Sequence, residues 1–125
     1  MTAIQKVGSL GENIVKNFLI SKKYKILLRQ YKIRQGEIDI ICRDNKYLVF
    51  VEVKTRTAKN FGTPEEAFAY KKRQCLLTAI YRYLQEQNYN GPWRVDLVCL
   101  QINRLTKRAQ LRHYKFVEME DIKTL

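Results

Sequence analysis

Histidine and cysteine are both scarce in this chain of 125 residues. The cysteines are Cys42, Cys75 and Cys99, an odd number at wide spacings, which excludes an even disulfide set and a cysteine-based zinc motif. Each cysteine lies in an apolar stretch, so we expect buried, reduced thiols. His113 is the only histidine, which argues against a histidine-based nucleophile or zinc site. We expect His113 to be a solvated residue on a strand.

Long apolar runs are also missing. No run approaches the ~20 residues that a membrane-spanning helix requires. Residues 1–8 lack the apolar core of a signal peptide, so we expect a cytoplasmic protein with no membrane partner. The length and a hydrophobic content of 46% suit one domain, residues 1–125, with loosely ordered ends at residues 1–7 and about 118–125.

Acidic residues are few compared with basic ones: 12 Asp and Glu stand against 24 Lys and Arg, a net charge of +12. This excess favours a polyanionic partner, and we expect nucleic acid, with DNA as the first choice. An anionic membrane surface is less favoured, because the chain shows neither a basic amphipathic helix nor a lipidation motif. A generally basic protein surface is the remaining alternative. The residues expected to bind nucleic acid are Arg56, Lys71, Lys72 and Arg73.

Apolar spacing predicts two helices and five strands. Helical periodicity covers residues 10–22, where Ser9 to Glu12 fits a capping box. A second helix start stands at Thr63-Pro64, ahead of an apolar helix face that runs to about residue 87. The predicted order is α-β-β-β-α-β-β, an α/β (α+β) fold with one mixed sheet flanked by helices. The strands are expected at residues 24–33, 36–41, 48–54, 93–102 and 110–117.

The clearest chemical pattern lies in the hairpin formed by residues 36–41 and 48–54. With Asn45-Lys46 as a two-residue loop, Asp39 lies opposite Glu52, and Lys54 shares a face with Glu52. Opposed side chains have Cβ atoms ~5 Å apart, so two carboxylates could share one divalent metal beside an ammonium. Phosphodiester cleavage needs oxygen ligands for Mg²⁺, for which Mn²⁺ can substitute, and a lysine that positions water. The pattern therefore predicts Asp39, Glu52 and Lys54 as catalytic residues.

The same residues also fit a structural interpretation. Asp39, Glu52 and Lys54 could form an ordinary polar face, in which Lys54 only balances the charge of Glu52. Glu37 would face Lys54 in this register, either to orient it or as a plain cross-strand pair. Glu12 is either the carboxylate of a capping box or a further metal ligand.

Other charged positions also allow two interpretations or favour a structural one. Arg56 follows Lys54 on the same face, where its guanidinium group suits phosphate oxygens. Lys71, near the start of the second helix, is either a phosphate ligand or part of a solvated helix face. Arg94 and Asp96 share a face of the strand at 93–102, and we expect an ion pair between them.

Several stretches resemble the YraN family of small bacterial proteins. They are Gly11-Glu12, GEIDII at 36–41, VFVEVKTR at 49–56, FGTPEEA at 61–67, Lys71 and RVDLV at 94–98. The fold of this family resembles restriction endonucleases and Holliday-junction resolvases, so the resemblance implies an endonuclease-like core. It also implies that the backbone carbonyl of Val53 adds a metal ligand. Val15 and Val95 depart from the usual family residues, both at packing positions.

These observations predict a Mg²⁺-dependent nuclease that acts on DNA, with branched and single-stranded DNA among the candidate substrates. Asp39 and Glu52 would hold the metal, and Lys54 would position the attacking water. The alternatives are a non-catalytic nucleic-acid-binding protein with an endonuclease-like fold, or a partner of RNA or ribonucleoprotein that uses only its basic surface. Symmetric cutting of both strands of a junction would require a homodimer.

Overall fold

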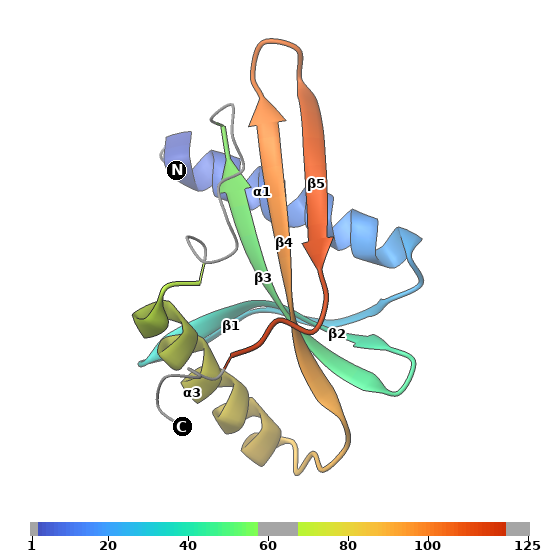
Figure 1. Cartoon of the computed structure of the whole chain (residues 1–125), viewed down its shortest axis with the longest axis vertical. Helices are drawn as coiled ribbons and strands as arrows, with labels where there is room; N and C mark the ends of the chain where they lie inside the picture. The colour runs from blue at the N-terminus through green and yellow to red at the C-terminus, as the bar shows by residue number, and fades with distance from the viewer. Residues whose placement is uncertain (1–2, 58–67, 120–125) are drawn as a thin grey trace.

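The computed structural model describes residues 3–57 and 68–119, and in this part of the chain the predicted order of elements is confirmed. The chain forms a mixed α+β fold in which two helices flank a five-stranded sheet (Figure 1). Within the described residues, no helix combines the length and apolar character that crossing a membrane would take. The elements are α1 (Ala3–Ser21), β1 (Lys25–Ile33), β2 (Gly36–Asp44), β3 (Tyr47–Arg56), α3 (Tyr70–Glu86), β4 (Trp93–Asn103) and β5 (Arg108–Tyr114).

The strands lie in the order β1-β2-β3-β4-β5, and only the pair β3–β4 is parallel. A parallel pair requires a crossover connection, and α3 lies within the one that joins β3 to β4. In Figure 1, β3, β4 and β5 extend together toward one end of the molecule, whereas β1 and β2 run across them. The sheet is therefore strongly twisted between its two halves.

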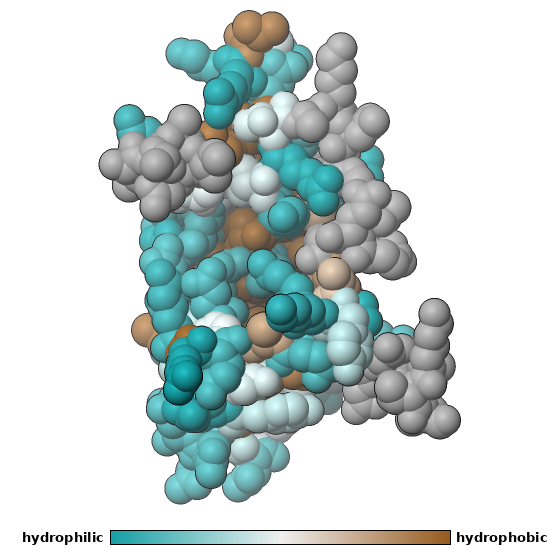
Figure 2. All heavy atoms as spheres, turned by 90° about the vertical axis from the view of Figure 1, so that its left-hand side faces the viewer, coloured by the Kyte–Doolittle hydropathy of each residue, from teal (hydrophilic) through white to brown (hydrophobic). Residues whose placement is uncertain are grey.

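Each helix covers one face of the sheet. Val15 and Leu19 of α1 are fully buried in a cluster with Ile40, Val49 and Val51. The opposite cluster joins Leu76, Leu77, Ala79, Ile80 and Tyr83 of α3 to Ile38, Ile41, Leu48 and Phe50, among other residues. Burying such an aliphatic or aromatic side chain stabilises the fold by ~1.5–3 kcal/mol. Seen from the side, the molecule is mostly hydrophilic, with apolar atoms visible between the polar groups (Figure 2).

Several predicted boundaries need correction. Helix α1 begins at Ala3, so the loose lead-in expected for residues 1–7 is wrong from Ala3 onward, and Ser9 lies inside the helix and cannot cap it. At the other end, Met119 is buried in the cluster under α3, at the start of the segment from about residue 118 that was expected to be loosely ordered. The predicted helix start at Thr63-Pro64 and residues 120–125 lie outside the described residues.

A buried polar network anchors β4, and it confirms the expected ion pair between Arg94 and Asp96. The Arg94 Nε atom lies 3.0 Å from Asp96 Oδ1, and both side chains are almost completely buried. Arg94 Nη2 also donates to Tyr24 and Asp44, and His113 Nε2 lies 2.8 Å from Asp96 Oδ2. His113 is therefore not the solvated residue that was expected, because the buried Asp96 carboxylate requires partners.

The contrast between buried and exposed ion pairs can be tested by mutation. Arg94→Leu leaves the fully buried Asp96 without its main countercharge, and it should reduce the free energy of unfolding by ~3–5 kcal/mol. Lys32→Met removes the ion pair between Lys32 and Glu37, in which the two side chains are 65% and 54% exposed. This change should reduce the free energy of unfolding by only ~0–1 kcal/mol. Urea unfolding followed by circular dichroism measures both changes. Equal losses in the two variants would contradict the assigned role of the buried network.

Candidate active site

The candidate site begins where β2 separates from β3. Regular pairing runs from Asp44 and Tyr47 to Ile40 and Val51, in the register expected from a two-residue loop. It stops one step before Asp39 and Glu52, so these two residues do not form the ladder pair that was expected. Strand β3 continues to Arg56 and stays paired with β4 on its other side. Beyond Val51, β2 therefore provides no ladder partner for β3.

Strand β2 changes the direction in which its side chains face at Asp39. Ile38 packs into the cluster under α3, whereas Ile40 packs into the cluster under α1. In a regular strand these two residues would share one face. On β1, the neighbours of Gln30 pair with Ile38 and Ile40, so Gln30 lies opposite Asp39. The φ angle of Gln30 is 53°, which is in the left-handed region. Both strands are thus irregular at the same level of the sheet, and such outliers often mark functional sites.

The irregularity turns Asp39 toward the freed edge of β3. The backbone N–H of Val53 donates a hydrogen bond to Asp39 Oδ2 over 2.8 Å. This bond satisfies a backbone donor that lost its ladder partner when the strands separated. It also holds one carboxylate oxygen of Asp39 beside β3, next to Glu52.

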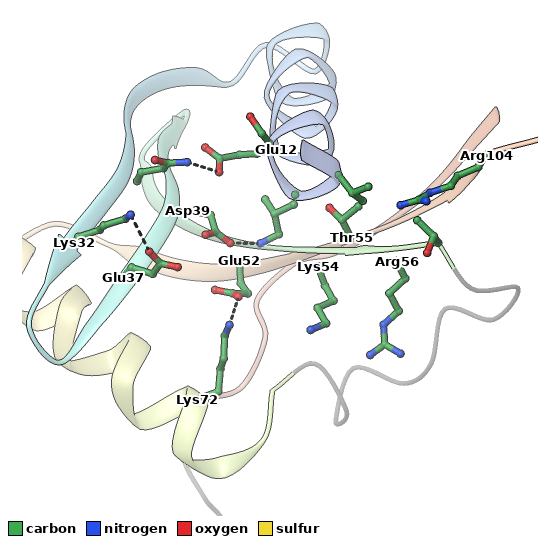
Figure 3. A pocket seen from close by; sticks show the side chains of 16 residues that line it. Glu12, Lys32, Glu37, Asp39, Glu52, Lys54, Thr55, Arg56, Lys72 and Arg104 are labelled. Carbon is green, nitrogen blue, oxygen red and sulfur yellow. Dashed lines mark hydrogen bonds and ion pairs between the residues drawn. The ribbon is translucent and has the colours of Figure 1, made fainter. Parts of the chain in front are cut away.

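A cavity of about 1220 Å³ opens along this edge and brings the predicted residues together. In Figure 3, Glu52, Lys54 and Arg56 extend from β3 in the same direction, toward α3, whereas Glu12 comes from α1 on the other side of the strand. The cavity therefore reaches around the edge of β3, between the two helices. Its charged lining residues are Glu12, Lys32, Glu37, Asp39, Glu52, Lys54, Arg56, Lys72 and Arg104.

The two central carboxylates repel each other. Burial, followed by the neighbouring charge of Glu52, raises the pKa of Asp39 from its ordinary 3.8 to about 7, against the lowering effect of the Val53 hydrogen bond. Burial also raises the pKa of Glu52, although Lys72 acts in the opposite direction. The site therefore holds a proton more readily than two separate surface carboxylates would.

Some of the predicted basic residues line the cavity, and others lie outside it. Lys54 and Arg56 line the cavity as expected. Lys72 reaches from α3 and forms an ion pair of 3.0 Å with Glu52 Oε1, so its ammonium contacts a predicted metal ligand. Lys71 is exposed on α3, and Arg73 Nη1 donates to the backbone carbonyl of Phe68 over 2.7 Å.

Two predicted acidic residues have other partners than expected. Glu12 is buried, with its two oxygens accepting hydrogen bonds from Arg29 Nε at 3.1 Å and Gln30 Nε2 at 3.3 Å. Its role as a capping residue is wrong, because α1 begins well before it, and its role as a metal ligand stays a prediction. Glu37 pairs with Lys32 of β1 at 3.9 Å, because it lies opposite Lys32 in the β1–β2 ladder. The expected pairing of Glu37 with Lys54 is therefore replaced by this contact.

The donor set fits a hard divalent cation that keeps most of its own water. Among residues 3–57 and 68–119, no three side chains of His, Cys, Asp or Glu are grouped to hold a metal ion. Mg²⁺ commonly uses one or two protein carboxylates together with water and substrate phosphates. Asp39 and Glu52 supply two carboxylates whose repulsion a cation would relieve, and Val53 lines the same cavity. The residues present therefore suit Mg²⁺ or Mn²⁺.

Some residues of the site carried no recognisable signal in the sequence. Gln30 belongs to a strand pattern, and Arg104 belongs to the turn between β4 and β5, yet both line the cavity. Gly11, which belongs to the Gly11-Glu12 stretch noted in the sequence, also shapes the site, because a Cβ atom there would overlap the side chain of Thr55. Helix α1 can approach β3 this closely only with glycine at that position, and the approach sets the wall of the cavity that carries Glu12.

Comparison with known proteins identifies the family. Residues 11–100 match the model of a family described as "Uncharacterised protein family UPF0102", which is the YraN family expected from the sequence. A UPF0102 protein from Caldanaerobacter subterraneus is 45% identical over 98 residues, which cover 78% of this chain and 80% of the relative. A UPF0102 protein from Carboxydothermus hydrogenoformans is 40% identical over 114 residues, covering 90% and 95%. One from Alkaliphilus oremlandii is 36% identical over 110 residues, covering 87% and 94%.

The contact between α1 and β3 predicts opposite effects at two glycines of one helix. Gly11→Ala should reduce the free energy of unfolding by ~1–3 kcal/mol, because its Cβ would overlap Thr55. Gly8→Ala meets nothing within 4 Å and should stabilise the protein by up to ~1 kcal/mol through its helix propensity. Thermal and urea unfolding of both variants measure the difference. Stabilisation by Gly11→Ala would show that the helix does not depend on this close approach.

The raised pKa of Asp39 predicts a pH dependence of stability in the absence of metal. The folded state holds a proton that the unfolded chain releases, so the stability contributed by this group is complete below about pH 4 and is lost as the pH rises through about 7. Asp39→Asn cannot ionise, so its unfolding free energy relative to wild type should increase by ~1–4 kcal/mol between pH 4 and pH 8.

Urea unfolding in EDTA across this pH range tests the prediction. Glu118→Gln replaces an exposed acid outside the cavity and serves as the control, which should follow the wild-type curve. If the difference between Asp39→Asn and wild type does not change with pH, then burial and the charge of Glu52 do not raise the pKa of Asp39.

Proposed function

This chain belongs to the UPF0102 family, and we propose that it is a metal-dependent nuclease that acts on DNA. The observation that carries the proposal is the pair Asp39 and Glu52 at the freed edge of β3, in one cavity with Lys54 and Arg56. Two adjacent carboxylates destabilise the metal-free fold, and perturbed acids of this kind in a cleft are candidates for chemistry. The cations beside them suit a phosphodiester substrate.

The residues of this site have separate roles in the proposed reaction. Asp39, Glu52 and the backbone carbonyl of Val53 would hold Mg²⁺ or Mn²⁺. When bound, such a metal polarises a phosphate oxygen and promotes ionisation of a water molecule. Lys54 donates hydrogen bonds to the attacking water or to the phosphate oxygen on which negative charge develops. Arg56, next along the same strand face, binds a neighbouring phosphate through its guanidinium fork.

The charge of the whole chain supports a nucleic acid as the substrate. A net charge of +12 attracts a polyanion, and Lys54, Arg56 and Arg104 place part of that charge inside the cavity. Binding that depends on such contacts weakens as salt is added, because the cations displace condensed counterions. A homodimer would bring two such sites to one substrate, which symmetric cutting of a junction requires.

A cleavage assay with matched variants tests the proposal. Wild-type protein with Mg²⁺ or Mn²⁺ should cleave at least one DNA from a panel of duplex, single-stranded, flap and four-way junction substrates. Asp39→Asn, Glu52→Gln and Lys54→Met should each reduce cleavage on the order of 100-fold or more, as expected when a group that stabilises the transition state is lost. Loss of cleavage in Asp39→Asn and Glu52→Gln, purified in the same way, excludes a contaminating nuclease. Glu118→Gln, which replaces an exposed acid outside the cavity, should retain wild-type activity.

Thermal unfolding separates metal binding from cleavage. Mg²⁺ at 100 times its dissociation constant should stabilise wild type by about 2.7 kcal/mol and leave Asp39→Asn unchanged. Metal stabilisation and salt-sensitive DNA binding without cleavage of any substrate would favour the alternative, a nucleic-acid-binding protein with an endonuclease-like fold. Equal metal responses in wild type and Asp39→Asn would rule out the proposed site.

A further inference from the structure

Lys72 pairs with Glu52, the same carboxylate that the proposed metal would bind. Its Nζ atom lies 3.0 Å from Glu52 Oε1, and the Glu52 side chain is only 5% exposed. We propose that Lys72 holds the metal-free site in a resting state by pairing with Glu52, and that it turns to a substrate phosphate when a divalent cation takes that carboxylate. This inference rests on the proposed function, because it assigns a second ligand to a residue of the same cavity.

The geometry of the pair suits exchange. The Lys72 side chain is 50% exposed, and the contact joins one ammonium to one carboxylate oxygen. The pair formed by Arg94 and Asp96 differs, because those side chains are only 4% and 0% exposed and are joined through two guanidinium nitrogens. A half-exposed lysine on a flexible four-carbon stem can leave its partner without leaving a buried cation behind. The Arg94 pair cannot be opened at a similar cost.

Charge explains why the two states exclude each other. The ammonium of Lys72 partly neutralises Glu52 beside the Asp39 carboxylate, and therefore supplies part of the charge that a metal would bring. A divalent cation bound to Glu52 would repel that ammonium at short range. Lys72 would then lose its closest anion within the cavity.

The position of Lys72 across the cavity supports its second partner. Figure 3 shows Lys72 rising from α3 toward β3, whereas Lys54 and Arg56 extend from β3 toward α3. A phosphate between these elements would meet cations from both sides, which neither element provides alone. Arg82 lies on the same helix, is exposed and does not line the cavity, so it serves as the control cation.

The proposal predicts opposite changes in metal affinity and cleavage. At pH 8.5, where proton competition for the carboxylates is weak, Lys72→Gln should bind Mg²⁺ or Mn²⁺ about tenfold more tightly than wild type in the absence of DNA, because one repulsive charge is gone. The same variant should cleave DNA at least about tenfold more slowly, because it lacks the phosphate contact. Lys72→Arg, which keeps the charge, should bind metal as wild type does, and Arg82→Gln should match wild type in both measurements.

Isothermal titration calorimetry with the metal alone, followed by single-turnover cleavage, provides the two measurements. If wild type binds metal in a way that Glu52→Gln abolishes, yet Lys72→Gln binds it no more tightly, then the inference about Lys72 is wrong while the proposed function stands. Parallel losses of metal affinity and cleavage in Lys72→Gln would also overturn it, since they indicate a purely structural ion pair. If no variant and no wild-type protein binds metal, the proposed function fails and this inference fails with it.

Discussion

The separation of β2 from β3 at Asp39 is the constraint on which the rest of the site depends. A strand that loses its neighbour exposes backbone donors, and an unsatisfied donor is costly inside a protein. Asp39 resolves this by accepting a hydrogen bond from the Val53 N–H, so the residue that ends the ladder also brings a carboxylate to the strand edge. The cavity opens along the edge of β3 that this break in pairing leaves free, and Glu52, Lys54 and Arg56 line it.

Two ion pairs of this molecule differ in their burial, and therefore in how easily they can be opened. Arg94 and Asp96 are buried and are joined by two hydrogen bonds. Aromatic rings lie around the Arg94 guanidinium, and both side chains have further hydrogen-bond partners, so the pair is part of the core. Lys72 and Glu52 meet at the boundary of a large cavity, with the lysine half exposed. The first pair fixes β4 against the end of the β2–β3 hairpin, because Arg94 also pairs with Asp44. In the second pair, Glu52 remains at the cavity, where another cation could replace Lys72.

The helices position the site without supplying its central groups. Helix α1 approaches β3 closely because Gly11 has no Cβ to meet Thr55, and this contact places Glu12 in the cavity wall. Glu12 is then held by Arg29 and Gln30 of β1, so α1, β1 and β3 meet around the cavity that Asp39 also lines. Such support limits how far the carboxylates can move, and a fixed donor geometry is what a metal-dependent reaction requires.

The sequence by itself determined the order of the elements, the register of the β2–β3 hairpin and the shared face of Glu52 and Lys54, because alternation and turn chemistry are local properties of neighbouring residues. Asn45, for example, adopts the positive φ that a tight hairpin turn favours. How Asp39 reaches Glu52 was decided by the tertiary structure, because β2 leaves its regular pairing at that residue. Only the tertiary structure decided the partners of Lys72, Glu12 and Glu37. Lys72 meets Glu52 across the gap between α3 and β3, Glu12 meets residues of β1, and Glu37 meets Lys32 because β1 pairs with β2 there. Contacts between elements depend on how the sheet twists and where its ladder ends, and no periodicity within one segment encodes either.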